Sequence, residues 1–167
     1  QYTTPTTLTI DDKATTVNTI LRYRAERPTL PLFKRQSGGH WINVTAKQFV
    51  DEVDQVAKGL IASGIHAGDR VAILSSTRFE WTLLDYAIWR AGATTVAIYE
   101  TSAPDQVQYL LEDSGTVALV VEDANHRDKF REVTDGLPAL RETLVIDDGA
   151  VNELTNRGKD VPDAELD

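Results

Sequence analysis

The stretch "RVAILSSTRFEWTLLDYAIWRAGATTVAIY", residues 70–99, decides the fold, because two short apolar runs flank one segment of helical length. The runs at 71–75 and 94–99 have the length of strands, and Gly92 closes the segment 78–91 between them. Strands that are apolar along their whole length are typical of a parallel sheet that is covered by helices on both faces. The stretch therefore predicts a β–α–β unit of buried strands.

The same alternation continues toward the carboxyl end. Further strands are predicted at 117–121 and 143–147, and further helices at about 103–113 and 124–134. Right-handed crossovers wind such units into a three-layer α/β/α fold with a mostly parallel sheet.

A helix and a hairpin are predicted before this α/β unit. The helix extends from about Thr16 to Glu26, and Pro28 prevents its continuation. Two extended runs, Leu32 to Gln36 and His40 to Val44, then flank Gly38 and Gly39, where positive φ angles are accessible.

The next helix has the clearest start in the chain. Thr45 and Gln48 have the spacing of a capping box, and Val44 with Phe49 has the spacing of a hydrophobic staple. The apolar face of this helix repeats with helical period, at Phe49, Val53, Val56, Ala57, Leu60 and Ile61. Gly64 supplies its left-handed end.

Three segments are expected along the chain. Residues 1–14 are Thr-rich and expected to be extended, and 15–147 are expected to form one α/β subdomain. Residues 148–167 are acidic and weakly periodic, which is typical of a connection leading onward more than of a docked element. The 167-residue chain has no methionine, so we expect it to be part of a larger protein.

Composition excludes several classes of function. The formal charge of −9, from 26 acidic and 17 basic residues, disfavours a nucleic-acid surface. The chain has no cysteine, no signal-peptide pattern and no apolar run near the length of a membrane helix, which together favour a cytoplasmic protein.

The loops after the strands carry no recognised ligand motif. In doubly wound sheets ligands bind beyond the carboxyl ends of the strands, here at 75–78, 99–104 and 122–127. None of these loops contains a G-x-G-x-x-G, Walker or G-x-S-x-G pattern, so nicotinamide, flavin and hydrolase functions lose their main support.

Helix capping explains the polar residues in these loops better than catalysis does. Thr77 with Glu80, and Ser102 with Asp105, have capping-box spacing, and Asp123 precedes the third helix of the unit. No base lies near a hydroxyl nucleophile, Thr101 included, so we assign no catalytic residue.

The remaining candidates favour structural roles. The three histidines, at positions 40, 66 and 126, lack metal-ligand spacing, and no metal site is expected. Arg78 lies in a strand-end loop, where binding an anion and a plain surface role are both open. The aromatic residues Trp81, Tyr86 and Trp89 are expected to pack a helix that is apolar nearly all round.

The run from "WINVTAKQF" through "GDRVAILSSTRFEW" to "AGATTVAIYETSA" resembles the amino-terminal part of AMP-forming long-chain fatty-acid–CoA ligases, particularly actinobacterial ones. These enzymes belong to the adenylate-forming superfamily. The resemblance covers roughly residues 28–147. Many relatives have proline at the position of Ala97 and serine at that of Ala103, which argues against a chemical constraint on this loop.

The resemblance implies the reaction of a whole enzyme. ATP activates a fatty acid as an acyl-adenylate with Mg²⁺, and CoA then displaces AMP. The family's phosphate loop, T-S-G-T-T-G-x-P-K-G, and its catalytic lysine are absent from these 167 residues. The chain alone is therefore expected to be inactive and to bind no cofactor.

One family position falls inside the chain. In some relatives basic residues after the third strand approach the nucleotide phosphate of CoA, and Arg127 is the matching position, near Lys129 and Arg131. Acidic Asp128 and Glu132 interleave with them, which favours a solvated helix face over a CoA contact.

Other functions stay open from sequence. A related adenylating enzyme for an aryl, amino or short-chain acid would share this fold, and a free-standing flavodoxin-like binding module is a further alternative. The acyl chain length, a homodimer and peripheral membrane association are left open by these residues.

Overall fold

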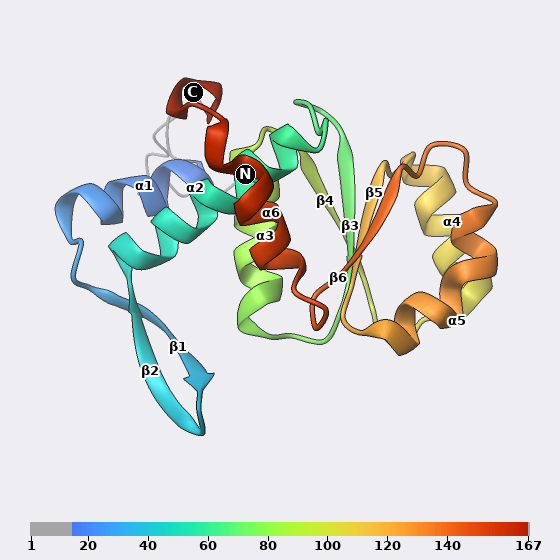
Figure 1. Ribbon diagram of the computed structural model, residues 1–167, viewed down its shortest axis with the longest axis horizontal. Coiled ribbons are helices and arrows are strands. Elements are labelled where there is room, and N and C mark those ends of the chain that lie inside the picture. The colour runs from blue at the N-terminus through green and yellow to red at the C-terminus, as the bar shows by residue number, and fades with distance from the viewer. Residues whose placement is uncertain (1–14, 167) are drawn as a thin grey trace, which may run out of the picture. The chain divides into compact units, whose positions relative to one another are not determined.

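The computed structural model describes residues 15–166 (Figure 1). The chain divides between Val50 and Asp51 into two compact units, and the expected boundaries of the subdomain, 15–147, stay a prediction. Helix α2, Ala46–Ala62, contains the division point. We describe the two units separately.

The first unit holds the predicted helix and hairpin. Helix α1 spans Thr16–Glu26, and the hydroxyl of Thr15 accepts a hydrogen bond from the Asn18 N–H at 3.1 Å. Strands β1, Pro31–Ser37, and β2, His40–Thr45, pair antiparallel around two glycines with positive φ. Both predictions are confirmed.

The start of α2 is also as predicted. The Thr45 N–H donates to Oε1 of Gln48 at 2.9 Å, and the Gln48 N–H donates to the Thr45 hydroxyl at 3.3 Å. Together they form the capping box, which satisfies two backbone donors at the helix start. Val44 and Phe49 are both buried, and Phe33 packs against Phe49 with ring centroids 4.6 Å apart. The direct staple contact between Val44 and Phe49 stays a prediction.

The second unit is built on a parallel sheet. Its strands are β3 (Arg70–Leu74), β4 (Thr94–Ile98), β5 (Ala118–Val121) and β6 (Glu142–Val145), in the order β4-β3-β5-β6. The predicted α/β/α layering is confirmed. In Figure 1, α4 (Pro104–Ser114) and α5 (Ala124–Asp135) cover one face of the sheet, and α3 (Phe79–Arg90) and α6 (Ala150–Arg157) cover the other.

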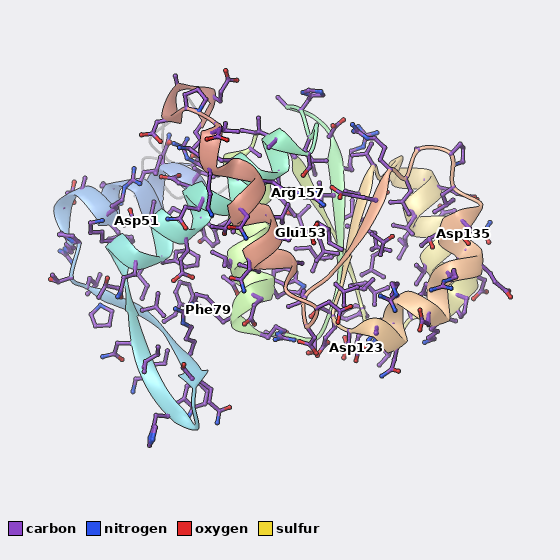
Figure 2. All side chains as sticks on the ribbon, viewed as in Figure 1. Asp51, Phe79, Asp123, Asp135, Glu153 and Arg157 are labelled. Atoms are coloured by element: carbon purple, nitrogen blue, oxygen red, sulfur yellow. The ribbon has the colours of Figure 1, made fainter. Side chains whose placement is uncertain are left out.

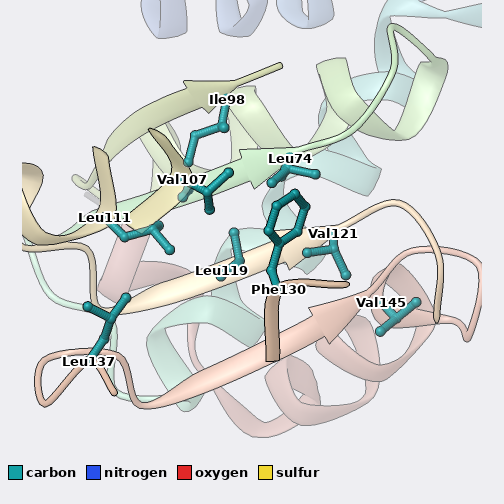
Figure 3. Packing of buried hydrophobic residues seen from close by; sticks show 10 residues of the cluster. Leu74, Ile98, Val107, Leu111, Leu119, Val121, Phe130, Leu137 and Val145 are labelled. Carbon is teal, nitrogen blue, oxygen red and sulfur yellow. The ribbon is translucent and has the colours of Figure 1, made fainter. Parts of the chain in front are cut away.

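The hydrophobic core lies on both faces of the two central strands, β3 and β5, whose apolar residues are all buried. Figure 3 shows the cluster between the sheet and α4 and α5, in which Phe130 of α5 joins aliphatic side chains from all four strands. Helix α3 has no exposed residue, which agrees with its expected burial, and its aromatic pair Tyr86 and Trp89 stacks edge-on at 5.2 Å.

Strand β4 differs from the buried strand that the sequence predicted. Thr94 and Ala97 are exposed, because β4 is the last strand of the sheet among the described residues and has a neighbour on one side only. The run 94–99 is uncharged and rich in β-branched residues, which favours a strand but does not determine its position within a sheet.

Residues 148–166 form the described part of the last segment. Within it α6 is followed by two 3₁₀ turns, Gly158–Asp160 and Asp163–Leu166, and three of its apolar side chains are buried: Ala150, Leu154 and Leu166. The expectation that this segment leads onward as a connection stays a prediction. The structure docks it because two glycines, Gly59 of α2 and Gly158, let the backbones approach closely.

Replacing Gly59 with alanine tests this close approach. A Cβ on Gly59 would lie 2.0 Å from the carbonyl oxygen of Leu154, a backbone atom that moves only if α6 shifts. We expect Gly59→Ala to lower the free energy of unfolding by about 1–3 kcal/mol, measured by urea denaturation, as for other overpacked cores.

The matched control is Gly136→Ala. Gly136 ends α5 with a negative φ, and a Cβ there would meet its nearest neighbours at 3.6 Å or more. The free energy of unfolding of Gly136→Ala should differ little from that of the wild type. If Gly59→Ala were as stable as the wild type, the docking of α6 on α2 would be wrong.

Candidate functional site

The order β4-β3-β5-β6 fixes where a ligand site is expected. From β3 the chain crosses to β4 on one side, and from β4 it crosses back to β5 on the other. Neighbouring strands whose crossovers leave in opposite directions open a crevice at their carboxyl ends, and open α/β sheets bind ligands there. In this chain the crevice lies beyond Leu74 of β3 and Val121 of β5.

Glu122 fills this crevice with its own carboxylate. Its Oε2 accepts the Ser76 N–H at 2.7 Å, and its Oε1 accepts the Ser76 hydroxyl at 2.9 Å. The Ser75 hydroxyl adds a longer bond to Oε2 at 3.4 Å. The backbone N–H of Glu122 donates to the carbonyl of Leu74, so the residue continues the pairing of β5 with β3.

These bonds favour the ionised carboxylate. The Ser76 N–H lowers the pKa of Glu122 below its ordinary value of 4.5; burial opposes this shift, and the Ser76 hydroxyl and the charge of Arg78 add to it. Glu122 is therefore an anion at neutral pH.

Arg78 binds the carboxylates around the crevice. Its Nε donates to Glu80 at 2.7 Å, its Nη1 donates to Asp147 at 2.8 Å, and Nη1 lies 3.9 Å from Oε1 of Glu122. The sequence left open whether Arg78 binds an anion. The structure shows that it does, and that the anions are carboxylates of the chain itself.

The network joins the loops after three strands. Ser76 and Arg78 follow β3, Glu122 follows β5, and Asp147 follows β6. The Ser76 N–H is already bonded to Glu122, so offering it to an anionic ligand would require breaking a charge-assisted hydrogen bond. The arrangement suits a fixed support better than a nucleotide pocket.

Two of the predicted caps are wrong. Helix α3 begins at Phe79 with Arg78 as its N-cap, and Thr77 lies outside the helix because Glu80 pairs with Arg78 instead. Likewise, Ser102 as N-cap would start α4 at Ala103, but α4 begins at Pro104 with Ala103 as its N-cap.

The reason at α4 is a different partner. The Ala103 N–H donates to Oε1 of Gln106 at 3.1 Å, so Gln106 takes the role that the sequence assigned to Asp105. The third cap is correct: Oδ1 of Asp123 accepts the His126 N–H at 2.9 Å, and Figure 2 shows Asp123 at the start of α5.

A small cavity beside β4 was not predicted. Its volume is about 290 Å³, and its walls come from the ends of β3 and β4 and from α3: Ser75, Thr77, Trp81, Ala97, Ile98, Tyr99 and Glu100. The only signal in the sequence is that aromatic residues lie shortly after two strands. Its lining residues include no acid–base pair and no cluster of cations, so they suggest no catalytic or anion-binding role.

Arg127, the one predicted cofactor-binding residue, lies in the first turn of α5. Its guanidinium pairs with Asp128 at 3.1 Å and with Asp148 at 3.4 Å. Nearby, Lys129 donates to the carbonyl of Ser102 and Arg131 pairs with Asp128. The cations thus face acidic neighbours, as the solvated-face alternative expects, and Arg127 remains a prediction for CoA.

The histidines are not brought together. His40 lies in β2, His66 precedes β3, and His126 bonds Asp123 through Nδ1 at 2.8 Å. Across residues 15–166 no group of three or more His, Cys, Asp or Glu side chains has the geometry to hold a metal ion. In the same residues no helix is both long enough and apolar enough to cross a bilayer.

Comparison with known proteins gives a consistent result. The family described as AMP-binding enzyme matches residues 21–166. A long-chain-fatty-acid–CoA ligase of Mycobacterium bovis, FadD15, is 38% identical over 165 residues, which are 97% of this chain and 28% of that protein. The chain thus spans less than a third of the length of this curated relative.

Two further likenesses concern structure and length. The crystal structure of the N-terminal domain of FACL13 from Mycobacterium tuberculosis matches 89% of this chain and 37% of its own, with 27% identity and a TM-score of 0.72. An uncharacterized protein of that organism, Rv1549, is 28% identical over 145 residues, which cover 87% of this chain and 79% of that protein.

Replacing Glu122 with glutamine tests the crevice network. The amide keeps the shape but places an NH₂ group against donors and removes the charge, so we expect a loss of about 1–3 kcal/mol at pH 7. Folding lowers the pKa of Glu122, so the Glu122 carboxylate stabilises the folded state above pH 4.5. This stabilisation is lost as the pH falls through the pKa that Glu122 has in the folded state.

The difference in unfolding free energy between wild type and Glu122→Gln should therefore shrink in acid, and urea denaturation from pH 7 to about pH 3 measures it. Glu132→Gln, an exposed change on α5, is the control and should show no such difference. A pH-independent difference would mean that the charge of Glu122 is irrelevant.

Proposed function

We infer the function of the chain from its family, because it belongs to the AMP-binding enzymes. We propose that it is the amino-terminal α/β part of a long-chain fatty-acid–CoA ligase. The whole enzyme would activate a fatty acid with ATP as an acyl-adenylate, releasing pyrophosphate, and then transfer the acyl group to the thiol of CoA. The likeness to FadD15 over nearly the whole chain is the observation that carries this proposal.

The chain's own residues support a scaffold role within that enzyme. The crevice where the topology expects a ligand holds Glu122 and Arg78, and neither the loops nor the cavity offers a phosphate cradle. ATP would therefore bind to residues outside this part. The described residues do not fit Mg²⁺, because no group of three or more His, Cys, Asp or Glu side chains among them has the geometry to hold a metal ion.

Two alternatives are weighed against this proposal. A ligase for an aryl, amino or short-chain acid would share the fold, and the names of the relatives favour a long-chain acid. A free-standing flavodoxin-like module is disfavoured, because Glu122 already takes the Ser76 N–H that a flavin or nucleotide phosphate would need.

Three finer expectations belong to this proposal. The enzyme would be cytoplasmic, would form a homodimer, and would associate peripherally with membranes, where its substrate resides. Analytical ultracentrifugation of the whole enzyme tests the dimer, and cell fractionation tests the location.

Acid-dependent exchange of pyrophosphate into ATP tests the activity. We expect the whole enzyme to catalyse exchange with long-chain fatty acids at least tenfold faster than with short-chain or aryl acids, because adenylation is the first half-reaction. Faster exchange with an aryl or amino acid would favour the related ligase instead.

The 167-residue chain alone is the control for this experiment. It should show no exchange, and calorimetry should detect no micromolar binding of ATP or FMN, because the switch-point crevice is filled. Micromolar affinity for either ligand would support the free-standing module.

We keep Arg127 as a proposed contact to the nucleotide phosphate of CoA. In the whole enzyme Arg127→Ala should raise the KM for CoA about 5- to 20-fold, the loss expected of one charge-assisted hydrogen bond, and leave ATP–pyrophosphate exchange unchanged. We propose the 3′-phosphate as the group contacted, so dephospho-CoA, which lacks it, should be used equally well by variant and wild type.

Arg131→Ala is the matched control, since Arg131 lies one turn further along α5 and pairs with the same Asp128. An equal effect of both variants, or an effect that persists with dephospho-CoA, would assign Arg127 to the solvated helix face.

A further inference from the structure

The charge of the chain is distributed unevenly. Residues 15–50 contain six Lys or Arg and one acidic residue, Glu26, which gives +5, whereas residues 51–167 contain ten basic and 23 acidic residues, which gives −13. The net charge of −9 therefore hides a basic segment that coincides with the first compact unit. A surface at this end attracts anions within a Debye length although the whole chain is acidic.

The β1–β2 hairpin of this unit also exposes large apolar side chains. Trp41 is 69% exposed and Ile42 is 40% exposed, although both types are usually buried. They lie next to the turn, at the end of the hairpin away from Phe33 and Val44, where the hairpin meets the buried Phe49. Their exposure is therefore a property of the hairpin tip.

The register places cations beside these apolar residues. Gln36 pairs with Trp41 and Lys34 with Asn43, so Lys34 and Trp41 share one face of the ribbon. Arg35 pairs with Ile42 on the other face. Each face of the hairpin thus combines an exposed apolar side chain with a neighbouring cation.

The other exposed large apolar residues lack this setting. Tyr99, Tyr109 and Leu110 belong to the acidic second unit, and the surface around the last two includes Asp105. Among the described residues, exposed tryptophan and a local excess of positive charge therefore occur together only on the hairpin.

This combination matches the chemistry of an anionic membrane surface. Tryptophan is favoured at the headgroup level, where its ring is buried and its N–H stays hydrated, and each nearby Lys or Arg gains from the negative surface potential. An aliphatic side chain such as that of Ile42 gains by entering the acyl boundary.

We propose that the tip of the β1–β2 hairpin, with Lys34, Trp41 and Ile42 at its centre, is a contact surface for membranes rich in anionic lipid. The binding is reversible, because two apolar side chains and a few cations provide only marginal affinity. The proposal names the surface for the peripheral association proposed above, and it rests on the proposed ligase function only for its biological purpose.

Vesicle co-sedimentation of the 167-residue chain tests the proposal. Vesicles of phosphatidylcholine alone are compared with vesicles that also contain phosphatidylglycerol. We expect binding to the anionic vesicles only, reduced about fivefold in Lys34→Ala, which removes one cation, at least as strongly in Trp41→Ala, and weakened by high salt.

Two matched controls lie in the acidic unit. Lys159→Ala removes an exposed cation, and Tyr109→Ala removes an exposed aromatic ring. Both should bind as the wild type does. Urea denaturation of every variant checks that the fold is kept.

Tryptophan fluorescence gives a second readout. Trp41 is exposed, whereas Trp81 and Trp89 are half-buried in α3, so anionic vesicles should shift the emission to shorter wavelength through Trp41. The shift should disappear in Trp41→Phe, a variant that keeps an aromatic ring and should still sediment with the vesicles.

Equal binding to neutral and anionic vesicles, or wild-type binding by both Lys34→Ala and Trp41→Ala, would overturn the proposal. So would binding of a single-stranded oligonucleotide without binding of vesicles. These results are independent of the ligase assignment, because sedimentation requires no activity and pyrophosphate exchange requires no membrane.

Discussion

The second unit depends on the burial of β3 and β5 on both faces. A parallel strand with no exposed face needs a partner at each edge and a helix layer on each side, because its backbone groups and side chains are all removed from water. Strands β4 and β6 supply the outer partners, α4 and α5 supply one layer, and α3 and α6 supply the other. The position of every loop discussed above follows from this arrangement.

That burial also explains the acidic surface network. At the carboxyl ends of parallel strands the N–H groups of the following loops point outward, and in many proteins they donate hydrogen bonds to a bound phosphate. Here Glu122 satisfies the Ser76 N–H, and Arg78 balances the charge together with Asp147 and Glu80. The chain therefore stabilises internally a place where homologous topologies bind ligands, which is consistent with a part whose chemistry is carried by other residues.

Local patterns determined most of the fold in advance. The capping box at Thr45, the glycine turn of the hairpin and the alternation of apolar strands with helices all act over a few residues, so the sequence expresses them directly. The resemblance to acyl-CoA ligases, which rests on a long specific run, predicted the family correctly.

The failures involve contacts between distant residues. Nothing around Thr94–Ile98 indicates an edge position, and the sequence does not reveal that Gly59 of α2 faces the backbone of α6. Similarly, Glu80 accepts a hydrogen bond from Arg78, and Gln106 accepts one from the Ala103 N–H. Each of these single hydrogen bonds accompanies a helix start that lies one residue later than the sequence predicted. The filling of the crevice by Glu122 required the register of β3 and β5, which no single segment contains.

The open edge of β4 has a consequence for how such a part behaves outside a larger protein. Among the residues that the structure describes, no strand pairs with the outer side of β4, and Thr94, Thr95, Val96 and Ala97 carry no charge that would discourage pairing there. Such an edge is a template that does not distinguish between an intended strand and a copy of itself. The strand with the higher effective concentration pairs first, so a strand in the same polypeptide outcompetes one from a second molecule. An isolated chain would instead self-associate more as its own concentration rises.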